Sequence, residues 1–374
     1  MMGIVKSKIA ICHQTAVTHD AIGNDICGMY DLLASMGFEP VILCEYADET
    51  ISKTKITNLS FKSNEINNYG IVIYHHSIFW KRGEELLNLY KGIPIIKFHN
   101  ITPPYFFDTY SSRYTKICRD GWEQTKRFIN LKKPHFWLAD SEFNQNDLLN
   151  LGEKQDYIEV VPPFHKFDTC FLERQLTSYE NKCPYYAMFV GRIAPNKGHM
   201  TLLKILHSYK TRISNNIVLR IAGKGDEEIS GYGFQIEKAI NELDIAANIE
   251  FVGNLSQDNL NELFQTSHLY LCTSEHEGFC VPIIESQVVG LPIVAMDSSA
   301  VKETMGEGQL VLPKPSTDED YFLYARIIQE VCSNIDLRHT VIRNGYRNFR
   351  KRFTKEVIEN KFINAIMPFI RRIV

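Results

Sequence analysis

Short apolar runs alternate along this chain with longer stretches in which apolar residues recur at helical spacing. The first half contains "SKIAIC", "NDICGMYDLLASMG" and "EPVILC", and then "YGIVIYHH", "RGEELLNLYKG" and "IPIIKFHN". Buried strands that alternate with amphipathic helices are typical of parallel sheets with crossover helices. The pattern therefore predicts an α/β fold.

The same alternation returns in the second half, from "YYAMFVG" through "IVLRIAGKG" and "LYLCTS" to "LPIVAM". It predicts two Rossmann-like, doubly wound domains, and a chain of 374 residues is long enough for both. We place them at residues 1–175 and 176–354, because "PPFHKFDTCFLERQLTSYENKCP" between them has no sustained period. The amphipathic stretch at about 355–374 is expected to form a helix that packs back on the first domain.

The composition favours a globular protein with large cores. Hydrophobic residues make up 44% of the chain and charged residues 23%, and the formal net charge is −3. A chain with this charge has no general attraction for polyanions. We therefore expect no nucleic-acid partner.

The nine cysteines are scattered, and none forms the C-x-x-C spacing of a zinc or redox site. We interpret them as core residues of a reduced, cytoplasmic protein. No run approaches the roughly 18 uncharged apolar residues of a membrane span, and the apolar run at the start is too short for a signal peptide. The cysteines are Cys12, Cys27, Cys44, Cys118, Cys170, Cys183, Cys272, Cys280 and Cys332.

The stretch "LYLCTSEHEGFCVPIIESQVVG" predicts a buried strand, a loop at its carboxyl end, and a helix from Pro282 to Gly290. In an open α/β sheet such a loop faces the ligand crevice, and the helix N-terminus favours an anion. The backbone N–H groups expected to point at this anion are those of Gly278, Phe279, Cys280 and Val281.

Glu277 and Glu285 flank this predicted phosphate site. A carboxylate beside a phosphate is unfavourable unless hydroxyl groups donate hydrogen bonds to it, so a sugar and a ribose are suitable partners for the two acids. The alternative is that they are ordinary acids near a helix N-terminus, where they stabilise the helix dipole.

A second motif, "FVGRIAPNKGH", places Arg192 and Lys197 in the turn after another strand. Arginine binds phosphate through its planar fork and lysine as a point charge, so the two can hold a diphosphate. The alternative is a pair of solvated loop charges.

Two further candidates lie in the first half: His99 at the end of a strand, and Gly23, where backbone and ligand can approach closely. A structural histidine is the alternative for His99. Asp318 and Asp320 have the spacing of a metal-binding pair, but Thr317 followed by acids is better explained as a helix N-cap. We predict no metal.

Together these motifs resemble those of the retaining glycosyltransferases of family 4, which have the GT-B fold of two Rossmann-like domains facing across a cleft. "GRIAPNKG" resembles the family's diphosphate-binding loop, and Glu277 to Glu285 matches the spacing of its E-x7-E motif. "DAIGND", "FHNITPPYFF" and "ADSEFNQNDL" resemble segments of bacterial members that build surface polysaccharides such as O-antigen and capsule. The resemblance covers nearly the whole chain.

The resemblance implies a role for each candidate residue. Gly23 would lie near the donor phosphates and His99 beside the transferred sugar; Glu277 would bind sugar hydroxyls and Glu285 the ribose. The implied catalytic residues are His99, Arg192, Lys197 and Glu277. The implied donor-binding residues are Gly23, Arg192, Lys197, Glu277, Gly278, Phe279, Cys280, Val281 and Glu285.

The implied reaction moves a hexose from GDP-mannose or a UDP-hexose to a glycan acceptor, lipid-linked and at the inner membrane face, with retention and without metal or cofactor. Positive groups would stabilise the leaving diphosphate. Two alternatives stay open: an epimerase acting on nucleotide sugars in a similar two-domain fold, and a nonenzymatic protein that binds nucleotide sugars or glycans. A lipid-linked acceptor would also imply peripheral contact with the membrane.

Overall fold

The computed structural model describes residues 8–17, 20–47, 51, 56–58, 63–166 and 184–372. Cys170, Cys183 and most of the aperiodic stretch expected to connect the two domains lie outside these residues. The chain forms two compact units, described separately below. Unit 1 comprises Met1–Pro103, Lys116–Lys166 and Thr354–Val374, and unit 2 comprises Pro104–Thr115 and Phe167–Phe353.

Unit 1 is built on a parallel sheet with the strand order β5-β3-β1-β6-β7-β8-β9. β1 and β6 pair with each other, and the direction in which strands are added to the sheet changes between them. The strands β3 and β5 follow on the side of β1, and β7, β8 and β9 follow on the side of β6. The strands are β1 (Lys8–Cys12), β3 (Glu39–Cys44), β5 (Ile56–Asn58), β6 (Ile71–His76), β7 (Ile95–Phe98), β8 (Phe136–Ala139) and β9 (Ile158–Val160), with a separate pair β2 (Thr15–Ala16) and β4 (Tyr46–Ala47).

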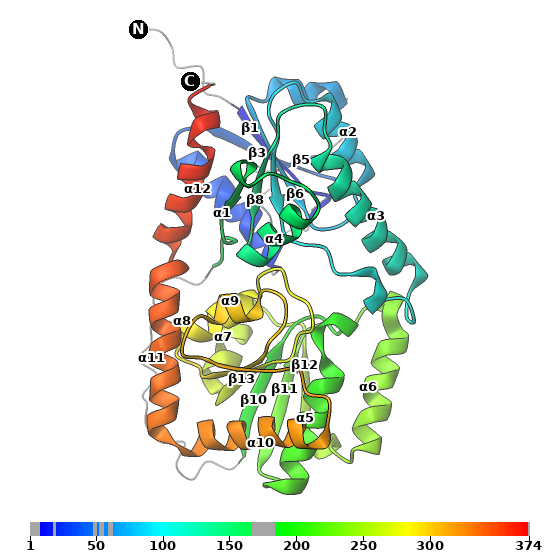
Figure 1. The fold of residues 1–374 in the computed structure, drawn as a ribbon, viewed down its shortest axis with the longest axis vertical. Helices are drawn as coiled ribbons and strands as arrows, with labels where there is room; N and C mark the ends of the chain where they lie inside the picture. The colour runs from blue at the N-terminus through cyan, green and yellow to red at the C-terminus, as the bar shows by residue number, and fades with distance from the viewer. Residues whose placement is uncertain are drawn as a thin grey trace. The chain divides into compact units, whose positions relative to one another are not determined.

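The helices of unit 1 cover this sheet, and one of them comes from the end of the chain. Ile358, Phe362 and Ile366 of α12 share a core with α1 and the sheet, and Figure 1 shows the two helices close together. The unit's helices are α1 (Ala21–Ser35), α2 (Lys81–Leu89), α3 (Ser112–Ile129), α4 (Glu142–Asn150) and α12 (Lys355–Ile370), with 3-10 turns η1 (Ser63–Asn68) and η3 (Gln155–Tyr157). The start of α3, up to Thr115, and the 3-10 turn η2 (Pro104–Phe106) belong to unit 2.

Unit 2 contains a second parallel sheet, with the order β12-β11-β10-β13-β14-β15. This is the strand order of a dinucleotide-binding Rossmann fold, with its switch point between β10 and β13. The strands are β10 (Tyr185–Val190), β11 (Ile217–Ala222), β12 (Ile249–Gly253), β13 (Leu269–Cys272), β14 (Ile293–Met296) and β15 (Leu310–Leu312). The prediction of two Rossmann-like, parallel-sheet halves is confirmed.

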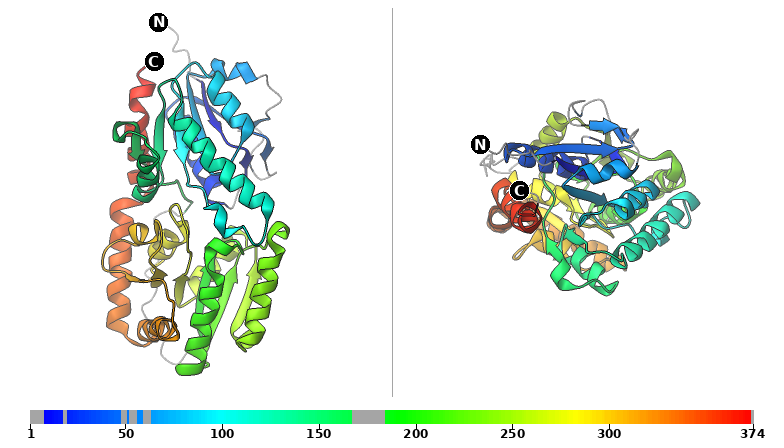
Figure 2. Two further views of the ribbon diagram at one scale, coloured as in Figure 1. Left: turned by 45° about the vertical axis from the view of Figure 1, so that its right-hand side comes forward. Right: turned by 90° about the horizontal axis from the view of Figure 1, so that it is seen from above.

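Helices cover both faces of the second sheet. One core contains residues of α5, α6 and α10, and another contains residues of α7, α8 and α9; the green helices α5 and α6 lie together in Figure 2. The helices are α5 (His199–Arg212), α6 (Ser230–Glu242), α7 (Gln257–Thr266), α8 (Val281–Val288), α9 (Val301–Met305), α10 (Asp318–Ser333) and α11 (Ile335–Arg352), with η4 (Pro195–Lys197), η5 (Glu227–Ile229) and η6 (Ala246–Asn248).

Three local predictions can be compared with the structure. Thr317 caps α10 in a capping box with Asp320, as predicted. Of the cysteines in the described ranges, six are buried, but Cys27 is only half-buried because it lies on a flank of α1. Among the helices of the described residues, none is both long and apolar enough to cross a membrane.

Candidate functional site

The loops that follow β10 and β13 meet at the switch point of unit 2. The two strands are direct neighbours in the sheet, with Ala187 opposite Leu269. Because parallel strands end at the same edge, the loops at 191–198 and 273–280 leave that edge side by side. The two motifs selected from the sequence therefore come together.

Backbone hydrogen bonds join these loops. The N–H groups of Glu275 and His276 donate to the carbonyl oxygen of Asn196, at 2.8 and 3.2 Å. The Asn196 side-chain amide donates back to the carbonyl of His276 at 3.3 Å. Asn196 is 4% exposed, so this buried asparagine sets the spacing between the two loops.

Gly198 brings the first loop against the second. Its φ is +69°, in the left-handed region, and a Cβ there would lie 1.9 Å from the carbonyl oxygen of Thr273. The Thr273 hydroxyl donates to the Gly198 carbonyl at 3.1 Å. A side chain at position 198 would force the loops apart.

Lys197 and Glu277 form an ion pair across the two loops. Their Nζ and Oε1 atoms are 2.7 Å apart, and the two side chains are 20% and 11% exposed. Burial acts to lower the pKa of Lys197, but the charge of Glu277 and its hydrogen bond outweigh it, so the pKa is raised above its ordinary value. The Glu277 N–H donates to Ser299 Oγ at 2.7 Å, which fixes the backbone under the carboxylate.

Glu285 lies further along, inside α8, and its side chain is buried. It is 8% exposed, and burial raises its pKa to about 8. Burial therefore favours the protonated carboxyl group, which can both donate and accept a hydrogen bond. The interpretation as an exposed acid that stabilises the helix dipole does not fit this environment.

The helix that carries Glu285 begins at Val281, one residue before the predicted start at Pro282. Cys280, its N-cap, has a φ of +75° although it is not glycine. The first N–H groups of a helix have no partner within the helix. Thr304 Oγ1 donates to the carbonyl oxygen of Phe279 at 2.6 Å, which holds the preceding residue in place.

Arg192 lies at the start of the first loop and is exposed. Burial acts to raise the pKa of Asp226, but the hydrogen bond from Tyr114 and the charge of Arg192 contribute to lowering it. Arg192 is thus close to Asp226, and its charge also acts on Lys197. The loop places two cations at one edge of the sheet.

The residues selected in unit 1 are Gly23 and His99. A Cβ on Gly23 would lie 1.7 Å from the carbonyl oxygen of Val17, and its N–H is bonded to Asp20, the N-cap of α1. The chain's own backbone therefore accounts for this glycine. The expected approach of donor phosphates stays a prediction.

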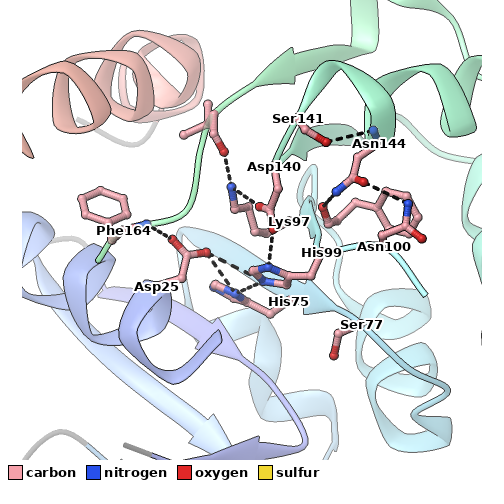
Figure 3. A network of polar contacts seen from close by, with 12 residues as sticks. Asp25, His75, Ser77, Lys97, His99, Asn100, Asp140, Ser141, Asn144 and Phe164 are labelled. Carbon is pink, nitrogen blue, oxygen red and sulfur yellow. Dashed lines mark hydrogen bonds and ion pairs between the residues drawn. The ribbon is translucent and has the colours of Figure 1, made fainter. Parts of the chain in front are cut away.

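His99 belongs to a buried polar network at the carboxyl ends of β6, β7 and β8 (Figure 3). Its Nδ1 lies 2.8 Å from Asp140 Oδ2, and its Nε2 lies 2.8 Å from His75 Nδ1. Lys97 forms an ion pair of 2.6 Å with the other oxygen of Asp140. Because both ring nitrogens have partners, the role of His99 beside a sugar also stays a prediction.

Sequence analysis missed several residues that shape the two loops. Asn196 and Gly198 lie inside a motif that was considered only for its charges, and "NKG" was a usable turn signal. Ser299 and Thr304 had no signal, because they act on residues 22 and 25 positions away. Phe106, whose ring lies 6.3 Å from that of His276, had none either.

Comparisons with known proteins place the second half of the chain near one family of transferases. Residues 175–348 match the family model described as Glycosyl transferases group 1. The chain is 24% identical over 179 residues to the lipopolysaccharide core biosynthesis glycosyltransferase LpsE of Rhizobium meliloti, with 48% of each protein covered. It is 23% identical over 190 residues to the O-antigen chain mannosyltransferase B of Escherichia coli, covering 51% of this chain and 48% of that protein. The chain thus spans about half the length of these relatives.

Solved structures resemble this chain over nearly its full length. Anabaena HepE in complex with UDP-glucose has a TM-score of 0.75 and 14% identity, with 96% of this chain and 99% of that chain covered. WaaG, a glycosyltransferase involved in lipopolysaccharide biosynthesis, has a TM-score of 0.70 and 12% identity, with 96% and 99% covered. At these identities the likeness shows the fold.

Proposed function

Since residues 175–348 match the family model of the glycosyl transferases group 1 and the chain has the GT-B fold, we propose that this protein is a hexosyltransferase. It takes a hexose from a nucleoside diphosphate sugar and transfers it to a glycan acceptor in surface polysaccharide synthesis. The observation that carries the proposal is the Lys197–Glu277 pair, 2.7 Å apart at the switch point of unit 2.

The geometry supports a donor site without a metal at the diphosphate. The ammonium of Lys197, the guanidinium of Arg192 and the N-terminus of α8 supply positive charge at one edge of the sheet. As the bond between the sugar and the diphosphate breaks, negative charge grows on the leaving group, and these groups stabilise it. Donor binding brings a second anion to Lys197, beside Glu277.

The two glutamates take different roles in this proposal. Glu277 accepts hydrogen bonds from sugar hydroxyls while it stays paired with Lys197. Glu285, held in its protonated form by burial, exchanges hydrogen bonds with the ribose. Retention of the anomeric configuration, GDP-mannose or a UDP-hexose as donor, and a lipid-linked acceptor that brings the protein to a membrane surface are the finer parts of the proposal.

Donor binding tests the proposal directly. Calorimetric titration with GDP-mannose, UDP-glucose, UDP-galactose and UDP-N-acetylglucosamine, in chelator, should give selective binding of one donor. Lys197→Met should lower that affinity by roughly 10- to 100-fold, because a hydrogen bond to a charged group contributes about 1.5–3 kcal/mol. Lys210→Met is the matched control, since Lys210 pairs with Asp244 on the surface of unit 2.

Product analysis with the selected donor then separates transfer from the alternatives. Release of nucleoside diphosphate only when a glycan acceptor is added, together with an extended glycan, is the expected result. A new nucleotide sugar formed without acceptor would indicate an epimerase, and binding without release under any acceptor a nonenzymatic protein. Unchanged donor affinity in Lys197→Met would contradict the site itself.

A further inference from the structure

We propose that Asp25, His75 and His99 in unit 1 bind one divalent transition metal ion of the zinc type. The three residues come from separate elements, because Asp25 lies on α1, His75 on β6 and His99 directly after β7. Figure 3 shows the three side chains pointing toward one another. None of the three residues belongs to unit 2, which holds the Lys197–Glu277 pair. A zinc ion on His99 Nε2 would take the place of the role beside the transferred sugar that the family resemblance implies for this residue.

The donor atoms have the separations that a common ion requires. Asp25 Oδ2 lies 3.6 Å from His75 Nδ1 and 3.7 Å from His99 Nε2, and the two nitrogens are 2.8 Å apart. Metal–ligand bonds of about 2.0–2.2 Å place tetrahedral ligands about 3.3–3.6 Å apart. The two distances from Asp25 lie at and just above the upper end of this range, and the two histidine nitrogens must move apart to reach it.

Surrounding contacts orient the ligands as they do in known metal sites. The far nitrogen of His99 is held by Asp140 at 2.8 Å, the carboxylate–histidine arrangement that fixes the tautomer of a metal-bound ring. The N–H of Phe164 holds Asp25 Oδ1 at 2.8 Å. This leaves Asp25 Oδ2 directed at the two histidines.

Burial and charge also favour a cation here. The Asp25 and His75 side chains are fully buried, and within the described residues Asp25 Oδ2 makes no hydrogen bond. The network contains the carboxylates of Asp25 and Asp140 but only one ammonium, that of Lys97. A buried carboxylate oxygen without a hydrogen bond is costly, and a bound cation removes that cost.

Bound metal would tie α1 to the carboxyl ends of β6 and β7. Two nitrogens and one oxygen suit zinc better than magnesium or calcium, which prefer oxygen ligands. Three protein ligands leave one tetrahedral position for water. Because the ion would join α1 to the ends of β6 and β7, it would stabilise the folded state of unit 1. The competing account is a single proton shared by His75 and His99.

Zinc titration of the untagged, full-length protein separates these accounts. After chelation and dialysis, we expect the folded apoprotein to bind one equivalent of zinc. The zinc-bound protein should have a higher melting temperature than the apoprotein. Asp25→Asn, nearly isosteric, should lower the affinity at least 100-fold, and Asp140→Asn by about 10- to 100-fold. Asp25→Asn should leave donor binding intact, which separates failure of this site from failure of the proposed function.

His76→Gln is the matched control, because His76 is a buried neighbour on β6 that bonds Thr125 instead, at 2.8 Å. It should bind zinc like the parent protein. Cobalt should give a visible spectrum without a thiolate charge-transfer band, and that spectrum reports on the parent protein even if a variant fails to fold. Absence of stoichiometric zinc binding, thiolate ligation, or equal affinity in Asp25→Asn would overturn the proposal.

Discussion

Glu285 lies in an environment that differs from what its residue type suggests. A glutamate near a helix N-terminus is usually an exposed anion, but this side chain is 8% exposed. Its neighbours in α8, Ile284 and Val288, belong to an apolar cluster with Phe349. The apolar surroundings favour the neutral acid, and this has a consequence for stability.

We expect Glu285 to make stability fall as pH rises. Its pKa is about 8 in the folded protein against an ordinary value of 4.5, so between these values the folded state binds more protons than the unfolded state. The stabilisation is present below pH 4.5 and is lost as pH rises through 8, with a limiting slope of about 1.4 kcal/mol per pH unit. Thermal unfolding from pH 5 to 9 measures it.

The control for this prediction is Glu285→Gln, which keeps the shape and cannot ionise. Its stability relative to the parent should increase from pH 5 to 8 and then level off. Glu307→Gln, at an exposed position of unit 2, should run parallel to the parent. If Glu285→Gln also runs parallel, the acid is ionised in the folded protein, and the protonated form proposed above for its contact with the ribose is wrong.

Sequence reasoning at this scale identified residues but not their pairing. Arg192, Lys197, Glu277 and Glu285 were selected from charge and spacing, and the structure places the first three at one sheet edge. The Lys197–Glu277 bond could not be predicted, since it joins residues 80 positions apart and depends on the adjacency of β10 and β13. Burial of Glu285 likewise depends on packing against α11, which local sequence does not show.

At the scale of elements, the donor loops depend on the turn at Gly198. This residue ends η4 and precedes α5, so it sets the direction of both. Its positive φ and its contact with the Thr273 carbonyl are two separate requirements for glycine. Gly37, after α1, meets only the first: its φ is +89°, and a Cβ at this position would have nothing within 4 Å.

Alanine at these two positions should therefore have unequal effects. Gly37→Ala should cost about 1–2 kcal/mol, the strain of a left-handed residue with a Cβ. Gly198→Ala should cost more, and it should weaken donor binding about tenfold or more, because displacement of the loop moves Lys197 from its pairing geometry. Denaturation and donor titration of both variants measure this. Equal costs and an intact donor affinity in Gly198→Ala would contradict the role of the turn.

Most elements could be predicted, because apolar periodicity is a local property of the sequence. Strands such as "YGIVIYHH" and "LYLCTS" appear where expected, as β6 and β13. The segment Pro104–Thr115 could not be placed from sequence: it follows the first-half strands but groups with unit 2, where Tyr114 bonds Asp226. Such an assignment depends on contacts between residues 112 positions apart.

At the scale of the whole chain, unit 1 is assembled from segments far apart in sequence. Its sheet is complete by Lys166, yet Thr354–Val374 returns to it and contributes to its core. The Phe362 ring of α12 is fully buried and packs edge-on against Phe164 at 5.6 Å. The folded state of unit 1 therefore requires residues made after the whole of unit 2.

Phe362→Ala should accordingly destabilise unit 1 and leave unit 2 intact. Removing a buried phenylalanine costs about 3–5 kcal/mol, and the loss falls on the core shared by α1, α12 and the first sheet. Hydrogen exchange measured by mass spectrometry should show faster exchange in peptides from β1, β3 and α1, but unchanged exchange in β10, β11 and α5. Asn364→Ala, at an exposed position of the same helix, should change neither. Faster exchange in both units would mean that they unfold together, and the division of the chain into two separately stable units would then be wrong.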